Sequence, residues 1–449
     1  MRTVFVGAGA CFANIMTDVL AKVDNNAAKN PMWRLLAEVI KYEGIDENNK
    51  NKHDIYYFDS GPELSREERN GQMFTYNISS GNMLSGAGNI MTAQKFWKER
   101  GDKMFRQMRT DIGDPKPDLF ISVRGCGATN CGSGFLLDRS ILERYTEAVI
   151  IQFLILPHRG EGIEASRVVY AISQAAELLQ QYPDRYTCVI ISNERILMAA
   201  KSFEAMGENW FYPLANQVVA DIIARVLYPT FYEHFKSIVD GFQGMSDMSV
   251  DDGSREKYLD VRDFVRQPGF RTVEFAHALD VEALDEEAVA AMVQKLGTEM
   301  ALVRYGDSEP MIYGSLGKME QTTVLFTMFM GPKGKVGDMT KVCLAEALEN
   351  AYLGAFPKVY VYDILRRGFE LLVFPSGGIP VDVSVWFEKF NKKLSNPRYA
   401  QVVEQYCMDL NEILRLYEKV ATYLQFSKPE LILSTRAKTN EQVRDSFTR

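Results

Sequence analysis

Two glycine-rich runs are the residues of this chain whose types and spacing best fit a chemical role. The first is Gly7-Ala8-Gly9, and the second extends from Gly125-Cys126-Gly127 to Gly132-Ser133-Gly134. Glycine adopts positive φ and lets backbone N–H groups approach a ligand, so such a run between a strand and a helix can bind an anion. Each run follows an apolar segment that predicts a strand. Together they predict one nucleotide held at the strand ends from two sides.

The second run is the stronger of the two. It is predicted to be a loop from Arg124 to Gly134, with a strand before it and a helix after it. Its amides and hydroxyls would bind di- or triphosphate oxygens at a helix N-terminus, where the helix dipole stabilises negative charge by about 0.3–1 kcal/mol. No Lys-Ser or Lys-Thr pair closes the run, so it is not a Walker A loop. A glycine turn without a ligand is the alternative interpretation.

Asp260 and Asp263 form a second pattern with chemical potential. Two carboxylates at i and i+3 share one face at a helix start, where they can orient a water molecule or bind a cation. The alternative is a helix-capping pair, which contributes about 0.5–2 kcal/mol to stability. The two residues by themselves leave both interpretations open.

The first half of the chain alternates strand-like and helix-like segments, which predicts an α/β layer with a largely parallel sheet. The glycine runs fall at the carboxyl ends of strands, where open α/β sheets bind ligands. The predicted strands are Thr3–Val6, Asp54–Phe58, Leu119–Val123, Ala148–Leu156 and Thr187–Ser192. The predicted helices are Ala13–Val23, Trp33–Tyr42, Thr92–Arg100, Gly134–Tyr145 and Ser166–Gln181.

The second half begins with a long amphipathic segment, about 210–239, in which Pro229 predicts a kink or break. The polar stretch Gly241–Glu256 predicts an exposed loop. A smaller α/β unit should follow from about Phe270, and helices from Val383 to about Gln425. The elements expected in the smaller unit are strands Glu299–Tyr305, Thr322–Met330, Lys358–Leu365 and Phe369–Phe374, and a helix Asp338–Tyr352.

Composition restricts the class of protein. The 449 residues are 46% apolar and 24% charged, which is ordinary for a soluble globular protein with two or three domains. A net charge of −8 argues against nucleic acid as the main partner. No apolar run approaches the roughly 20 residues that span a bilayer. Six scattered cysteines fit a reducing compartment, so a cytoplasmic location is expected.

Around these residues the sequence resembles the tubulin/FtsZ superfamily of GTP-binding filament proteins. Gly132-Ser133-Gly134 matches the end of that family's Gly-Gly-Thr-Gly-Ser-Gly signature, with Cys131 in the place of Thr and Thr129-Asn130 in the place of glycines. The segment from Gly7 to Asn14 resembles the first nucleotide loop of the family. Ser85-Gly86-Ala87-Gly88-Asn89 is similar to the tubulin loop near the γ-phosphate.

Further segments resemble the family in the same order along the chain. Phe58-Asp59, followed by Glu63, is similar to the strand end that approaches the magnesium ion. Ser192-Asn193-Glu194-Arg195 and Leu214-Ala215-Asn216-Gln217 resemble two segments whose asparagines contact guanine. Arg167, preceded by Glu161 or Glu164, falls near the ribose and phosphate loop. Asp260 and Asp263 resemble the Asp-x-x-Asp loop that enters the nucleotide site of the next subunit.

The resemblance implies a GTPase that binds GTP or GDP with Mg²⁺ and assembles head to tail. It implies a Rossmann-like GTPase domain over 1–208, a central helix with an inserted loop over 209–269, a second α/β domain over 270–385, and C-terminal helices and tail over 386–449. An adaptor protein would bind through these C-terminal helices or the tail. The catalytic residues would be Asp260 and Asp263, and the magnesium ligand Asp59. The nucleotide-binding residues would be Gly7, Ala8, Gly9, Ala10, Cys11, Asn14, Gly86, Ala87, Gly88, Asn89, Gly127, Cys131, Gly132, Ser133, Gly134, Glu164, Arg167, Asn193 and Asn216.

Three alternatives stay open at the level of sequence. The altered second run and the interrupted central helix fit a scaffold of the same fold that binds GTP without hydrolysing it. The first glycine run also fits a Rossmann-type oxidoreductase, although Asp59 lies well beyond the roughly 20-residue interval of a ribose-binding acid. Cys11, Cys126 and Cys131 would form a redox-sensitive or metal-binding cluster if the fold brings them together.

Overall fold

Parallel strands form the centre of the first half of the molecule. The computed structural model describes residues 2–27, 31–44, 47–49, 51–60, 72–79, 89–200, 211–230, 261–267, 269–278, 284–296, 298, 301–303, 311–332, 334–365, 368–406 and 410–423. The strands are β1 (Thr3–Ala8), β2 (Ile55–Asp59), β3 (Phe74–Asn77), β4 (Leu119–Arg124), β5 (Val149–Leu156) and β6 (Tyr186–Ser192). They lie in the order β3-β2-β1-β4-β5-β6, and every neighbouring pair is parallel. The five predicted strands are confirmed, and β3 is an addition.

Helices cover both faces of this sheet, so its strands are apolar on both sides. In β1, for example, Phe5 packs into the core on one face, and Val4 and Val6 pack into the core on the other. The first face carries α1 (Gly9–Asn26), α2 (Pro31–Val39), α7 (Asn193–Ala200), α8 (Phe211–Thr230) and α10 (Val261–Val265). The second carries α3 (Ile90–Phe96), α4 (Asp102–Ile112), α5 (Phe135–Arg144) and α6 (Ala165–Gln181). A π-helical turn, η4 (Trp97–Gly101), joins α3 to α4, and a short 3₁₀ turn, η1 (Glu47–Asn49), precedes β2.

Helix α8 is the described part of the predicted amphipathic segment. Its apolar residues Leu214, Val218, Ile222 and Val226 are buried against the first face of the sheet. Pro229 lies in its last turn, because the helix ends at Thr230. The remainder of the predicted segment and the predicted loop Gly241–Glu256 lie outside the described residues.

The second half of the chain continues the same sheet. Strand β7 (Phe270–Arg271) pairs in parallel with β6 and antiparallel with β14 (Phe369–Ser376). Beyond it lie β8 (Glu274–Ala278), β9 (Ala301–Val303), β10 (Met311–Ser315), β12 (Val324–Pro332) and β13 (Phe356–Leu365), covered by α11 (Glu286–Leu296) and α12 (Asp338–Ala351). A separate ribbon joins β11 (Met319–Glu320) to β15 (Ile379–Pro380). The strands and the helix predicted for the smaller unit are therefore present.

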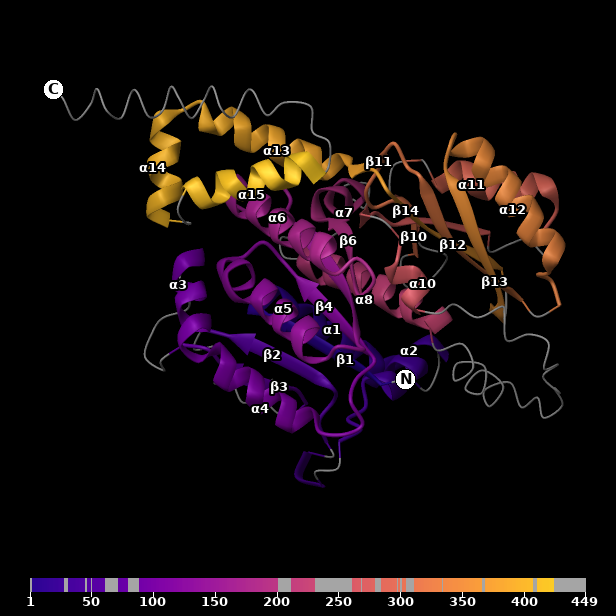
Figure 1. The fold of residues 1–449 in the computed structure, drawn as a ribbon. Coiled ribbons are helices and arrows are strands. Elements are labelled where there is room, and N and C mark those ends of the chain that lie inside the picture. Colours follow the sequence, from indigo (N-terminus) through magenta and orange to yellow (C-terminus); the bar gives the residue numbers. More distant parts are fainter. Residues whose placement is uncertain are drawn as a thin grey trace.

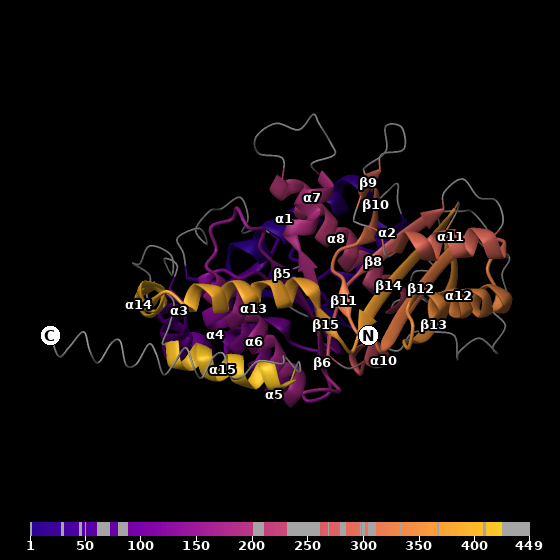
Figure 2. The ribbon, with the colours of Figure 1, turned by 90° about the horizontal axis from the view of Figure 1, so that it is seen from above.

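The C-terminal helices pack back onto the first half. They are α13 (Val381–Leu394), α14 (Pro397–Tyr406) and α15 (Leu410–Tyr423), as the sequence predicts. Helices α13 and α15 lie against α6, at the opposite end of the molecule from α11 and α12 (Figures 1 and 2). Two ion pairs, Lys393–Glu164 and Lys419–Glu177, link them to α6 and the residue before it. Among the described helices, none combines the length and the apolar character needed to cross a membrane.

Glu274 on β8 is a buried carboxyl group whose charge state should change near neutral pH. It is 3% exposed and accepts a hydrogen bond from the hydroxyl of Tyr352. Burial raises the pKa of Glu274 from 4.5 to about 7, although the hydrogen bonds from Tyr352 and Ser315 act in the opposite direction. The folded state therefore holds a proton that the unfolded state releases.

We expect Glu274→Gln to flatten the pH dependence of stability. Between pH 4.5 and 7 the wild-type free energy of unfolding should fall by about 1.4 kcal/mol per pH unit through this group, because the native state binds the extra proton. Glutamine stays neutral and removes this contribution, so the variant should be the more stable protein at pH 8. Urea unfolding at pH 5, 6, 7 and 8 measures it, with Glu99→Gln on the exposed surface as the matched control. Parallel pH profiles for wild type and Glu274→Gln would contradict the assignment.

Candidate nucleotide-binding site

The two glycine runs lie side by side at the carboxyl edge of the sheet. Strands β1 and β4 are neighbours, and the chain leaves them in opposite directions, β1 toward β2 and β4 toward β5. In open α/β sheets, ligands bind outside the strand ends at such a switch point. Helix α1 starts at Gly9, directly after β1, and Gly125 directly follows β4. The predicted meeting of the two runs is confirmed.

The first run is shaped by close packing. A Cβ on Gly7 would lie 2.0 Å from Cγ of Phe12, whose ring packs onto this backbone, so only glycine fits there. Gly9 has a φ of 76°, in the left-handed region that favours glycine. Cys11 is half-buried, and Asn14 lies exposed on α1.

The second run differs from the predicted loop. In the structure the loop is limited to Gly125–Gly127. The backbone N–H of Cys131 already donates to the carbonyl of Gly127 at 2.9 Å, and Asn130–Gly134 forms a π-helical turn, η5, that continues into α5. The prediction of a loop up to Gly134 is wrong because packing against α3 supports the turn: a Cβ on Gly132 would lie 2.5 Å from the carbonyl oxygen of Ile90. At Gly127, by contrast, a Cβ would meet no atom of the described residues within 4 Å.

Thr129 and Asn130 bring the two runs into contact. A Cβ on Gly9 would lie 3.4 Å from Cβ of Thr129 and 3.5 Å from Nδ2 of Asn130. Asn130 is 2% exposed, and its Oδ1 has no hydrogen-bond partner among the described residues. The first N–H groups of a helix have no intrahelical partner, so the start of this helical run presents donors beside the backbone of Gly127. This arrangement can bind an anion.

A buried ion pair lies directly beneath the second run. Arg124, the last residue of β4, donates from Nε and Nη2 to the carboxylate of Asp138 on α5, and both side chains are fully buried. Asp138 also accepts from Ser122 and from Gln152 at 3.0–3.2 Å. Burial raises the pKa of Asp138, and Arg124 opposes that rise. Sequence inspection did not single out this pair, although a charged residue at the end of an apolar strand was a visible signal.

Asp59 and Asn89 are both positioned by local hydrogen bonds. Asp59 ends β2, and its carboxylate accepts from the hydroxyl of Tyr57 and, at 2.7 Å, from the backbone N–H of Ser60. The Ser60 hydroxyl lies 3.3 Å from that of Thr129, so the end of β2 contacts the second run. Asn89 caps α3, with Oδ1 accepting from the N–H groups of Met91 and Thr92. The predicted neighbours Gly86, Ala87 and Gly88 lie outside the described residues.

Asn193, the first residue of α7 directly after β6, has an acceptor that is unused in the described structure. Its Nδ2 donates to Oε1 of Glu161 at 2.9 Å, and the N–H of His158 donates to the same oxygen. Oδ1 of Asn193 is buried and has no partner among the described residues. Glu161, one of the two alternatives weighed from sequence, is thus the glutamate beside Asn193.

Other predicted residues have partners elsewhere. Glu164 precedes α6 and accepts from Nζ of Lys393 on α13 at 2.8 Å, so it faces the C-terminal helices. Asn216 on α8 donates to Asp18 on α1, also at 2.8 Å. The carbonyl of Arg167 accepts a hydrogen bond from the thiol of Cys131, which brings α6 to the second run.

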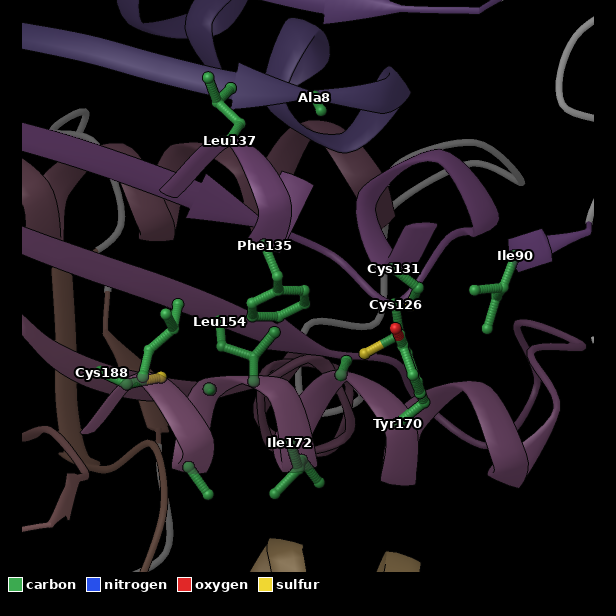
Figure 3. Close-up of a cluster of buried hydrophobic side chains, with 14 of the residues drawn as sticks. Ala8, Ile90, Cys126, Cys131, Phe135, Leu137, Leu154, Tyr170, Ile172 and Cys188 are labelled. Carbon is green, nitrogen blue, oxygen red and sulfur yellow. The ribbon is translucent and has the colours of Figure 1, made fainter. Parts of the chain in front are cut away.

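The cysteines near the site belong to the hydrophobic core. Figure 3 shows Cys126 and Cys131 next to each other, with Tyr170 of α6 pointing toward them. Cys126 and Cys131 belong to the second run, and their side chains are buried in the apolar cluster of the second face of the sheet. Burial raises the pKa of Cys126 well above its usual value. Within the described part of the chain, no three His, Cys, Asp or Glu side chains converge on a metal-sized space. A metal-binding cysteine cluster is therefore not supported.

The predicted catalytic pair is described only in part. Asp263 lies exposed in the short helix α10, and Asp260 lies just outside the described residues. Helix α10 is held by the buried Arg271, whose Nη2 donates to the carbonyls of Val265 and Gln267 at 3.2 Å. The guanidinium also lies 4.1 Å from the ring centroid of Phe264.

Comparisons with known proteins identify the fold. The sequence matches no protein-family model and no curated protein sequence. Its structure is similar to CetZ2 from Haloferax volcanii in a GTPγS-bound protofilament (TM-score 0.59, 12% identity, 87% of this chain and 97% of that chain). It is also similar to GDP-bound CetZ1 from Haloferax volcanii (0.55, 14%, 86% and 97%) and to CetZ from Methanosaeta thermophila (0.55, 13%, 94% and 99%).

These likenesses extend over 97–99% of each solved structure and over 86–94% of this chain. The chain therefore has the fold of the tubulin/FtsZ superfamily.

Proposed function

We propose that this chain binds GTP at the two glycine runs, assembles head to tail into filaments and hydrolyses GTP at the contact between subunits. The observation that carries the proposal is the meeting of Gly9 with the helix start at Thr129 and Asn130, at the switch point of a tubulin/FtsZ-type sheet. The similar solved structures hold GTPγS in a protofilament and GDP in a monomer.

The residues of this site have separate roles in the proposal. The backbone donors after Gly9 and Gly127 bind phosphate oxygens. Oδ1 of Asn193, which has no partner among the described residues, accepts a hydrogen bond from an N–H of the purine edge. Glu161 holds Asn193 in place from the other side. Mg²⁺ bound with the nucleotide would neutralise phosphate charge. Asp263 stands exposed on α10, where the next subunit can receive it.

Sedimentation with GTP, GDP and GTPγS tests the proposal, with phosphate release measured on the same samples. We expect pelleting that depends on GTP or GTPγS, and phosphate release per subunit that rises with protein concentration. Activity per subunit that is constant over a wide concentration range would contradict hydrolysis at a subunit contact. Absence of any stabilisation by GTP in a thermal-shift assay would contradict nucleotide binding itself.

A scaffold that holds GTP without turnover is the second candidate. It is favoured by Thr129 and Asn130, whose side chains fill the space against Gly9 where the resemblance places glycines. This candidate predicts stable polymers with GTP still bound and no phosphate release. An oxidoreductase of Rossmann type would instead be stabilised by NAD(H) and not by GTP in the same thermal-shift assay.

A further inference from the structure

Two asparagines near the proposed site each use their amide nitrogen on a carboxylate. Nδ2 of Asn216, on α8, donates to Oδ2 of Asp18, on α1, at 2.8 Å. Nδ2 of Asn193, at the start of α7, donates to Oε1 of Glu161 at 2.9 Å. An ionised carboxylate accepts hydrogen bonds and donates none, so it can face only the N–H₂ side of an amide. Each carboxylate therefore fixes which end of its asparagine is left for a ligand, and in both cases that end is the oxygen.

The two asparagines belong to neighbouring segments. Oε1 of Glu161 also accepts from the backbone N–H of His158, whose ring meets the ring of Phe211 edge to face, with 5.0 Å between the centroids. Phe211 is the first residue of α8 and precedes Asn216 by five positions. These contacts bring the start of α8, with Asn216, to the loop that holds Asn193.

Asp18 lies on a face of α1 that leads from the first glycine run toward α8. Helix α1 begins at Gly9, and the exposed Asn14 lies one turn before Asp18 on the same face. Burial raises the pKa of Asp18, and the hydrogen bond from Asn216 and the charge of Lys22 oppose that rise. Both opposing contacts favour the ionised form, which is the form that accepts from an amide.

We propose that Asp18 is a positioning residue that decides which purine this site accepts, and that Glu161 acts in the same way through Asn193. The inference rests on the proposed function, which places a purine edge at Oδ1 of Asn193. Asp18 is outside the residues that the family resemblance implies. With both amides fixed, the base meets two acceptor oxygens. Oδ1 of Asn193 is buried and has no partner among the described residues, so a base without an N–H there leaves it unpaired.

Two acceptor oxygens distinguish purines by the donors on their edges. Guanine presents adjacent donors, the ring N1–H and the 2-amino group, which match two oxygens. Hypoxanthine keeps only the ring N–H, xanthine has a carbonyl oxygen in place of the 2-amino group, and adenine has an acceptor in place of the ring N–H. Each hydrogen bond that is lost should cost about 10-fold in affinity, because a buried polar group is left unpaired. The site should therefore prefer GDP to IDP, and IDP to XDP and ADP.

Isothermal titration calorimetry of the full chain with GDP, IDP, XDP and ADP tests the inference. Wild type should bind GDP about 10-fold more tightly than IDP and about 100-fold more tightly than XDP. Asp18→Asn lets the amide of Asn216 turn over, because asparagine can present either an oxygen or an N–H₂ group to it. The variant should bind GDP more weakly and XDP more tightly, so the ratio of the two dissociation constants should fall by about 10-fold or more. Asp18→Ala should lower the same ratio, since it leaves the amide free to rotate.

Asp24→Asn is the matched control, because it makes the same change at an exposed residue of the same helix and should keep the wild-type ratios. A common factor of weakening for all four nucleotides in Asp18→Asn and Asp18→Ala overturns the inference, in favour of a purely structural contact between α1 and α8. Unchanged affinities in both variants overturn it as well, and so does a wild type that binds ADP as tightly as GDP. A wild-type chain that binds none of the four nucleotides overturns the proposed function instead.

Discussion

Asp263→Ala should bind GTP like wild type, and its rate of phosphate release should fall by about 100-fold or more. The side chain lies exposed on α10, so its removal leaves the core beneath that helix intact. A carboxylate that orients or deprotonates the attacking water contributes about 10²–10⁴ in rate, and the variant loses that contribution. Because hydrolysis then no longer limits polymer lifetime, its polymers should outlast those of wild type. Asp260→Ala is expected to behave in the same way.

Phosphate release and light scattering on the same sample measure both effects. Asp102→Ala is the matched control, since Asp102 is also an exposed carboxylate in the first turn of a helix. Wild-type phosphate release by Asp263→Ala would contradict the catalytic role and leave a helix-capping role for this residue.

A mixing experiment tests whether Asp263 acts on the neighbouring subunit. Gly9→Val places a branched side chain at a φ of 76° and against Thr129, so it should abolish nucleotide binding while leaving α10 unchanged. Alone, Gly9→Val should release no phosphate, and Asp263→Ala should release it only at its much reduced rate. Mixed polymers should regain activity, because GTP on an Asp263→Ala subunit then faces an intact Asp263. A mixture as inactive as its parts would indicate that the aspartate acts on its own nucleotide.

The central strands could be predicted from sequence because they are buried on both faces and therefore consist mostly of consecutive apolar residues. Strand β5, for example, is buried over its whole length from Val149 to Leu156, and a run of that kind has few alternatives. Strand β3 was missed because its four residues include an exposed Thr75 and give too short a signal.

The helical turn η5 at the end of the second run could not be predicted, since local composition and tertiary packing favour different structures there. Glycines at 125, 127, 132 and 134 indicate a loop. The helical backbone depends on Gly132 packing against α3, a contact between segments about 40 residues apart. Distant partners also determine where Glu164 lies, because its partner Lys393 is 229 residues away. A single sequence contains no record of such pairs.

Asp138→Asn should destabilise the protein by about 3–5 kcal/mol, because it leaves the fully buried Arg124 without a compensating charge. Asparagine has the same shape as aspartate and keeps one oxygen that can accept from the hydroxyl of Ser122, so the lost charge accounts for most of the effect. Urea unfolding measures it, and Glu99→Gln, in the exposed pair with Lys95, should change stability by less than about 1 kcal/mol.

Adding Arg124→Met to Asp138→Asn should then restore stability, since no buried charge remains uncompensated. A double variant that is less stable than Asp138→Asn would show that the guanidinium is held by contacts other than the ion pair.

The double variant also separates stability from binding. A Cβ on Gly134 would lie 3.1 Å from Cδ of Arg124, so the side chain of Arg124 packs against the end of the second run. Arg124 is also the residue directly before Gly125, so it supports the start of the run as well. We therefore expect GTP to stabilise the double variant less than wild type even where its free energy of unfolding has recovered. Equal stabilisation by GTP would mean that the backbone of the second run keeps its shape without the ion pair beneath it.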